Sequence, residues 1–199
     1  DRSVSRGLGD VYKRQKYDSD VVLDTVIAGN QRLFDIMREK DAIYAKEDFT
    51  EEDGIRASEL EEEFANMNGW DAETDAATLL NGLGIETELH YKVMNELADN
   101  DKVKVLLARA LFGNPDILLL DEPVSGLDPR VTAEMYQLIR NLNKKDGITI
   151  IMISHDIAAA VKYATHILHI GEHCFFGTKK QYLESSLGKA FTGQEGEDE

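Results

Sequence analysis

The feature that most constrains the fold is a short apolar run that ends in two carboxylates. Residues 117–120 read Ile-Leu-Leu-Leu, and Asp121, Glu122 and a turn with proline and glycine follow at once. A continuous apolar run of this length, bounded by turn signals, predicts a strand buried on both faces of a parallel sheet. Ligands of such sheets bind just beyond the carboxyl ends of the strands. The run therefore predicts a ligand site at which Asp121 can hold Mg²⁺ beside nucleotide phosphates and Glu122 can polarise a water molecule.

A helix and a second strand are expected directly after this turn. Apolar residues recur at helical spacing across 130–145, Gly147 ends the helix, and a second apolar run covers 148–153. The order strand, helix, strand implies a right-handed crossover between parallel strands. His155 follows the second strand and is expected at its carboxyl end. The pattern predicts an α/β fold.

Three motifs in this half of the chain resemble those of ATP-binding cassette (ABC) ATPases. Leu-Leu-Leu-Asp-Glu-Pro at 118–123 resembles the Walker B motif, Ser-Gly-Leu-Asp-Pro at 125–129 the D-loop, and Ile-Ser-His-Asp at 153–156 the H-loop. Their order and spacing favour this interpretation over the alternative, a buried strand that is followed by an acidic turn. The resemblance implies part of a P-loop NTPase core of the ABC type, with a parallel sheet and a helical subdomain.

The resemblance also implies roles for single residues and a pair of cofactors, ATP and Mg²⁺. Asp121 would hold Mg²⁺ through water, Glu122 would act on the nucleophilic water, and His155 would contact the γ-phosphate. The D-loop would contribute at the interface with a second ATPase domain, across which Asp128 would act. The D-loop residues implied at this interface are Ser125, Gly126 and Asp128.

A signature segment, Leu-Ser-Gly-Gly-Gln/Glu in the family, would occupy residues 97–101. In the family its backbone N–H groups, at the start of a helix, meet the γ-phosphate of ATP bound by the opposite domain. Here both glycines and the serine are replaced, and two aspartates place negative charge where a phosphate would bind. The segment consists of Leu97, Ala98, Asp99, Asn100 and Asp101. We expect a degenerate signature, followed by a helix that ends at Gly113.

Residues 21–70 are expected to be helical, because apolar residues recur there at helical spacing. The acidic stretch 47–53 is interpreted as a solvated helix face, with partner binding as the alternative. Trp70 is expected to be a packing anchor. Asp71 is expected to cap a helix at 72–81 that glycines then end.

A second resemblance relates the two halves of the chain to different branches of the family. Residues 22–27, the acidic hairpin and residues 77–85 resemble the first ATPase domain of ABC-F proteins, which bind ribosomes, and the match covers roughly 16–122. Residues from about 113 to 199 resemble the ATP-binding subunits of zinc and manganese importers instead. The D-loop is also of the transporter type, since ABC-F proteins typically carry Thr-Asn-x-Leu-Asp. A recombinant gene is one interpretation.

Residues 165–178 are expected to form two short strands around a Gly-Glu turn. Three histidines and a cysteine within them suggest a metal site: His166, His169, His173 and Cys174. The first two would point to opposite faces of a strand, and the spacing fits no common zinc pattern. Structural or solvated roles are therefore the favoured interpretation.

Composition restricts the partners. A net charge of -16 argues against generic binding to DNA or to anionic membranes. A single cysteine fits a reducing compartment, and no apolar run approaches the roughly 20 residues of a membrane span. We expect a cytoplasmic protein that meets the inner face of the membrane only through a permease.

The sequence contains no Gly-x-x-x-x-Gly-Lys-Ser/Thr, the P-loop that cradles phosphates. The isolated chain is therefore expected to hydrolyse no ATP. We divide it into a disordered or non-native leader at 1–15, a helical subdomain at 16–112, and the C-terminal half of an ATPase core at 113–199. Three functions stay open: a transporter ATPase with a permease partner and a divalent metal as substrate, an ABC-F ATPase with a ribosome partner, and a non-catalytic fragment.

Overall fold

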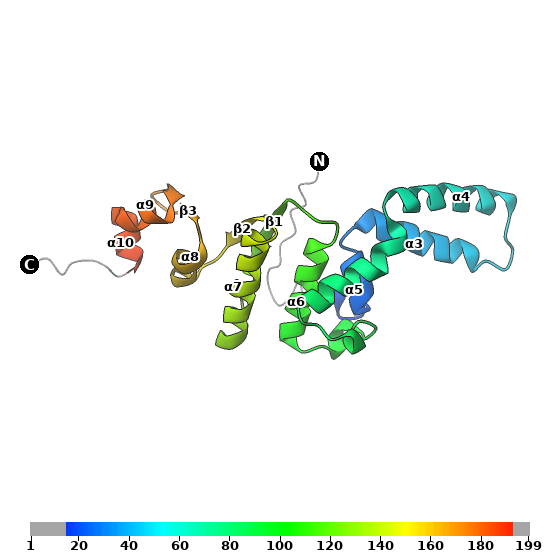
Figure 1. The fold of residues 1–199 in the computed structure, drawn as a ribbon, viewed down its shortest axis with the longest axis horizontal. Coiled ribbons are helices and arrows are strands. Elements are labelled where there is room, and N and C mark those ends of the chain that lie inside the picture. The colour runs from blue at the N-terminus through cyan, green and yellow to red at the C-terminus, as the bar shows by residue number, and fades with distance from the viewer. Residues whose placement is uncertain (1–14, 193–199) are drawn as a thin grey trace, which may run out of the picture. The chain divides into compact units, whose positions relative to one another are not determined.

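The computed structural model describes residues 15–192, so the leader predicted at 1–15 lies outside the described residues except for Gln15. The chain divides into two compact units, residues 1–151 and 152–199, which are described separately. The elements up to the boundary are η1 (Gln15–Tyr17), α2 (Val22–Ile27), α3 (Gln31–Tyr44), α4 (Glu51–Asn66), η2 (Gly69–Asp71), α5 (Ala72–Gly82), η3 (Thr87–Leu89), η4 (Met94–Glu96), α6 (Asp99–Leu111), β1 (Ile117–Asp121), α7 (Pro129–Lys144) and β2 (Thr149–Ile153), which crosses it (Figure 1).

The core of the first unit forms where α2, α5 and α6 pack against one another. α6 is amphipathic, and its apolar face is fully buried at Val105, Leu107 and Ala108. The turn after α2 approaches α6 so closely that a Cβ on Gly29 would lie 2.2 Å from the carbonyl oxygen of Arg109. Only glycine fits there, which fixes the entry into α3 against the end of α6.

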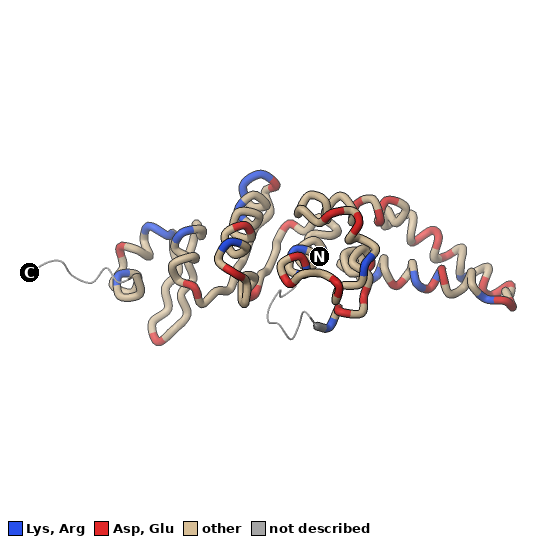
Figure 2. The backbone as a smooth tube through the Cα atoms, turned by 90° about the horizontal axis from the view of Figure 1, so that it is seen from below, with Lys and Arg blue, Asp and Glu red and all other residues tan. Residues whose placement is uncertain are grey.

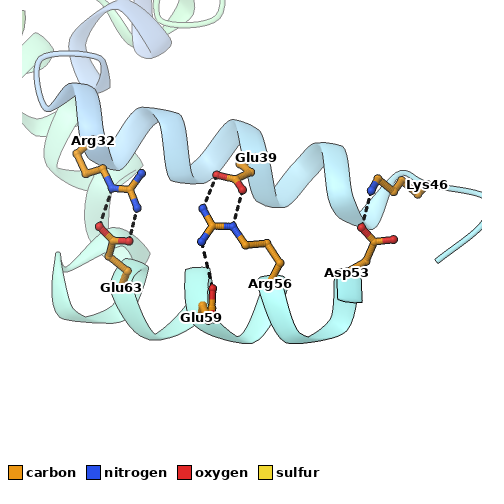
Figure 3. A network of polar contacts seen from close by, with 7 residues as sticks. All are labelled: Arg32, Glu39, Lys46, Asp53, Arg56, Glu59 and Glu63. Atoms are coloured by element: carbon orange, nitrogen blue, oxygen red, sulfur yellow. Dashed lines mark hydrogen bonds and ion pairs between the residues drawn. The ribbon is translucent and has the colours of Figure 1, made fainter. Parts of the chain in front are cut away.

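α3 and α4 form an antiparallel hairpin, and acidic residues are distributed along both helices (Figure 2). Ion pairs join the two helices along their length (Figure 3). Arg56 binds Glu39 through two nitrogens at 2.7 and 3.0 Å, and Arg32 binds Glu63 in the same two-pronged way. The acidic stretch 47–53 was predicted to be a solvated helix face, and this is wrong only for Asp53, which pairs with Lys46 of the loop, while the other four carboxylates are exposed.

The chain leaves the helical conformation between the two helices. Residues 46–50 form the connecting loop, and Thr50 starts α4 with a capping box. The Thr50 hydroxyl accepts from the Asp53 N–H at 3.2 Å, and the Asp53 carboxylate accepts from the Thr50 N–H at 3.0 Å. Asp53 also pairs with Lys46 across the loop. These contacts close the end of the hairpin.

Farther along the hairpin a lysine is buried among aromatic rings. Lys40 is 8% exposed, and its ammonium lies 2.9 Å from the Glu61 carboxylate and 3.9 Å from the centre of the Phe64 ring. Trp70, predicted to be a packing anchor, meets Phe64 edge-on at 5.0 Å and covers this cluster while it remains 69% exposed. Asp71 occupies the N-cap position of α5, yet its side chain makes no capping hydrogen bond, and the predicted cap is therefore wrong.

β1 and β2 pair in a two-stranded sheet, with α7 between them in the sequence. The Thr149 N–H donates to the Asp116 carbonyl oxygen at 2.9 Å, so the residues that enter the strands are neighbours and the strands run parallel. The predicted strand, helix and strand are thereby confirmed. Burial on both faces is wrong for the described residues: Leu118 and Leu120 are buried, whereas Ile117 is 41% exposed. Alternate residues of a strand point to opposite sides, and here the side of Leu118 and Leu120 is buried, whereas the other side is exposed at Ile117 and half-buried at Leu119.

The second unit contains α8 (Ile157–Tyr163), β3 (His166–His169), β4 (Phe175–Thr178), α9 (Lys179–Glu184) and α10 (Ser186–Thr192). β3 and β4 are antiparallel, with Leu168 opposite Phe176, which confirms the two strands predicted in the tail. Tyr182 of α9 is almost fully buried, and its hydroxyl lies 2.9 Å from Nδ1 of His169. Across residues 15–192, no helix combines the length and apolar character that a membrane span needs.

Candidate functional site

The two carboxylates of the predicted Walker B motif lie where β1 ends. Asp121 is the last residue of the strand, Glu122 follows it directly, and both are half-buried. Glu122 has φ +48°, in the left-handed region that residues other than glycine seldom adopt. Such conformations are costly and cluster at functional sites. The structure thus places both side chains at the carboxyl end of the strand, as the sequence predicts.

A tight turn leads from Glu122 to α7. The Ser125 N–H donates to the Glu122 carbonyl oxygen at 3.1 Å, and Gly126 has φ +72°. Ser125 and Gly126 are exposed on this turn. Asp128 ends it, and its carboxylate caps α7 by accepting from the backbone N–H groups of Arg130 and Val131 at 2.9 and 3.1 Å. In this chain Asp128 therefore has a local role that the sequence analysis did not assign.

The predicted signature segment forms the start of α6. Leu97 is buried, Ala98 occupies the N-cap position without a side-chain bond, and Asp99 and Asp101 lie in the first turn. Carboxylates there stabilise the helix, because its start carries partial positive charge, but they also compete with any anion for that charge. The structure agrees with the predicted position of the segment, and its weakened contact to phosphate stays a prediction.

Asn100 connects the signature segment to the D-loop within one chain. Hydrogen bonds from the N–H groups of Val131 and Arg130 and from the Asn100 side chain hold the pKa of Asp128 below its usual value. Asn100 and Asp128 are therefore in contact. A single sequence offers no signal for this contact between the two motifs.

His155 belongs to the second unit, while Asp121 and Glu122 belong to the first. His155 is exposed and follows β2, in the turn before α8. Asp156 caps α8 by accepting from the Ala159 N–H at 2.9 Å. The predicted position after the second strand is confirmed, whereas its contact to a phosphate stays a prediction.

The histidines and the cysteine of the tail have separate surroundings. His166 stacks on Phe176, and His169 contacts Tyr182 and Phe191. Cys174 is exposed on the turn between the strands. Within residues 15–192, no three His, Cys, Asp or Glu side chains are arranged to hold a metal ion.

Two family models match the chain. One, described as an ABC transporter, matches residues 16–125, which is more than half of the chain. The other, described as an AAA domain, matches residues 102–161. The first match runs from η1 through the Walker B carboxylates to Ser125, so it covers the helical region as well as β1.

Characterised and uncharacterised relatives agree with this family. An "uncharacterized ABC transporter ATP-binding protein YkpA" of Bacillus subtilis is 52% identical over 76% of this chain and 27% of its own length. A "probable ATP-binding protein YbiT" of Escherichia coli O157:H7 is 41% identical over 85% of the chain and 32% of its own length. The zinc import ATP-binding protein ZnuC of Acinetobacter baylyi is 36% identical over 52% and 41% respectively. The chain thus spans between a quarter and a half of these relatives.

Solved structures confirm the predicted α/β fold. MJ1267, an ATP-binding cassette of an ABC transporter in its ADP conformation, has a TM-score of 0.62 and 19% identity over 96% of this chain and 68% of its own. CbiO1 from Clostridium perfringens, part of the ABC transporter complex cbiONQ, has a TM-score of 0.52 and 28% identity over 63% and 50% respectively. The family model, which matches more than half of the chain, shows that the chain belongs to the ABC transporter family of ATP-binding proteins.

Proposed function

We propose that the chain is part of the ATP-hydrolysing subunit of an ABC transporter. One observation carries this proposal: Asp121 ends β1, and Glu122 follows it in a left-handed conformation at the start of an exposed turn. Adjacent carboxylates at the carboxyl end of a parallel strand suit a Mg-nucleotide site. Membership of the family supports the same assignment.

The carboxylates fit Mg²⁺, because carboxylate oxygens and water are the ligands that this ion prefers. Asp121 would hold the ion through water, and Glu122 would orient and polarise the water that attacks the γ-phosphate. His155 would donate a hydrogen bond to a γ-phosphate oxygen, and Asp128 would act at the interface with a second ATPase domain. Bound ATP supplies the phosphoryl group that is transferred to water.

The phosphate cradle itself is not among the residues of this sequence. We propose that the chain alone binds Mg-ATP weakly and that a segment with Gly-x-x-x-x-Gly-Lys-Ser/Thr is needed for tight binding. Without backbone N–H groups and a lysine to balance the phosphates, Asp121 and Glu122 present only negative charge. Without a P-loop segment, the chain would correspond to the third candidate, a non-catalytic fragment.

A divalent metal is the substrate that the relatives suggest, because ZnuC is named as a zinc import protein. The partners would then be a second ATPase domain and a membrane permease, with the chain at the inner face of the membrane. An ABC-F ATPase bound to ribosomes is the second candidate. It rests on the sequence resemblance of residues 16–122 to those proteins alone. Copurification with a permease would favour the first candidate, and cosedimentation with ribosomes the second.

Calorimetric titration with Mg-ATP tests the nucleotide site. The experiment compares this chain with a version in which a P-loop segment precedes residue 16. We expect micromolar affinity only for the second, and Asp121→Asn in that version should weaken binding when Mg²⁺ is present and have little effect in EDTA. Micromolar binding of Mg-ATP by the chain as it stands would contradict the proposal.

A further inference from the structure

The end of the α3–α4 hairpin carries apolar side chains that face solvent. We call residues 44–55 the hairpin tip. Within it Tyr44, Phe49 and Ile55 are 55%, 50% and 58% exposed, and the rings of Tyr44 and Phe49 stack nearly parallel at 6.5 Å. A Cβ on Gly54 would lie 3.6 Å from the Phe49 ring, so this ring rests on the first turn of α4. Tyr44 and Phe49 form an apolar patch, and Ile55 adds an exposed apolar side chain in the same turn of α4 as Gly54.

This patch is held in shape by contacts around it. The Tyr44 hydroxyl donates to Glu61 at 3.2 Å, and Lys46 pairs with Asp53, whose carboxylate also caps α4. The same Lys46–Asp53 bond and the Thr50 hydrogen bonds lower the pKa of Asp53 to about 2. Apolar groups on a fixed frame lose little conformational entropy when a partner covers them.

The hairpin that carries the patch is predominantly negatively charged. The hairpin, residues 31–66, has twelve Asp and Glu against five Lys and Arg. Four of these bases are paired with carboxylates inside the hairpin, and Arg38 lies over the Phe34 ring. Four exposed carboxylates of the tip have no basic partner among the described residues: Glu47, Asp48, Glu51 and Glu52. They lie on both sides of Phe49 in the sequence.

We propose that the hairpin tip binds a basic polypeptide segment, one in which lysine or arginine side chains flank an apolar anchor. The anchor would cover Tyr44, Phe49 and Ile55, and the bases would pair with the four carboxylates. A protein partner follows from the charge, because nucleic acid and anionic lipid would be repelled by the same carboxylates. The site lies outside the nucleotide region and does not depend on ATP binding.

Fluorescence anisotropy with the whole chain tests this surface. The probe is a labelled amphipathic helical peptide with leucines on one face and lysines on the other. Charge is removed from the tip by E47Q, D48N, E51Q and E52Q together, and apolar surface by Y44S and F49S. Exposed ion pairs are individually weak, so loss of all four charges together should weaken binding at least about fourfold. The apolar double variant should weaken binding by a similar factor, since the anchor is lost.

A matched control separates the tip from the acidity of the whole chain. The variant E73Q, D75N, E86Q and E88Q removes the same charge from exposed residues on α5 and η3, and it should change the affinity less than about twofold. A peptide with serine in place of leucine should bind the parent more weakly. Equal weakening by the control variant, no change in the tip variants, or tighter binding of single-stranded RNA than of the peptide would overturn the proposal. Circular dichroism of each variant shows whether the hairpin remains folded.

Discussion

Replacing Leu120 by alanine tests the one-sided burial of β1. Leu120 is fully buried, so its truncation removes transfer free energy and leaves a cavity, together worth about 3–5 kcal/mol of unfolding free energy. Ile117 lies in the same strand but is 41% exposed. Its truncation should cost only about 1–2 kcal/mol, because less apolar area leaves solvent and no closed cavity forms. The lower strand propensity of alanine affects both variants alike.

The assay is urea unfolding followed by the fluorescence of Trp70, the only tryptophan of the chain, which lies in the same unit as β1. With a slope of about 2 kcal/mol per molar urea, Leu120→Ala should lower the midpoint by roughly 1.5–2.5 M. Ile117→Ala should lower it by less than about 1 M. Leu118→Ala serves as a second buried case and should resemble Leu120→Ala. Equal shifts for Leu120→Ala and Ile117→Ala would refute the one-sided burial.

Three further predictions concern the helices. Gly69→Ala should destabilise the end of the hairpin, because its Cβ would lie 2.3 Å from the Phe64 ring; the Trp70 emission spectrum and thermal melt report this change. The pKa of Asp53 is lowered to about 2, so its stabilisation of the hairpin is complete above the unfolded value near 3.8 and is lost as the pH falls toward 2. Helical circular dichroism should decline over that range, and less so in Lys46→Ala. Asp128→Ala should speed amide exchange at the start of α7, while Asp128→Asn, which can still accept the capping bonds, should restore protection.

Much of the fold follows from local patterns in the sequence. The helical spacing across 130–145 and the apolar runs on either side predict α7, β1 and β2 with bounds close to those observed. The start of α4 is also predictable from the sequence, because the pattern Thr-x-x-Asp before a helix signals a capping box. Thr50 and Asp53 form that box in the structure. Asp71 had equally good capping chemistry, yet its side chain does not bond, because the 3-10 turn η2 leads directly into α5.

Burial is harder to predict because it depends on distant residues. The Leu-rich run at β1 has the composition of a strand covered on both sides, but composition does not say which sides are covered. Lys40 shows the same limit: nothing in its sequence neighbours indicates that its ammonium lies against Phe64 and Glu61.

Some features of the candidate site could be predicted from the sequence, and others could not. The motif places Asp121 and Glu122 at the end of a strand, and the structure agrees. The left-handed conformation of Glu122 has no sequence signal, since glycine is the residue that normally marks such positions. The cap formed by Asp128 could have been predicted, because aspartate before a proline at the first helical position is a common helix start. The contact of Asp128 with Asn100 could not be predicted, because it joins segments that are far apart in the chain.

The most direct test of the proposed roles is ATP hydrolysis by Glu122→Gln. The variant is made in a cassette that carries a P-loop segment before residue 16 and is paired with a partner domain whose signature has its glycines. Glutamine keeps the shape of the side chain and removes a charge beside the phosphates, so ATP binding should hold or tighten. The steady-state rate should fall by roughly 10²–10⁴, because a carboxylate that polarises water is lost. Hydrolysis at the parent rate would contradict the account, since Glu122 would then not be the carboxylate that acts on water.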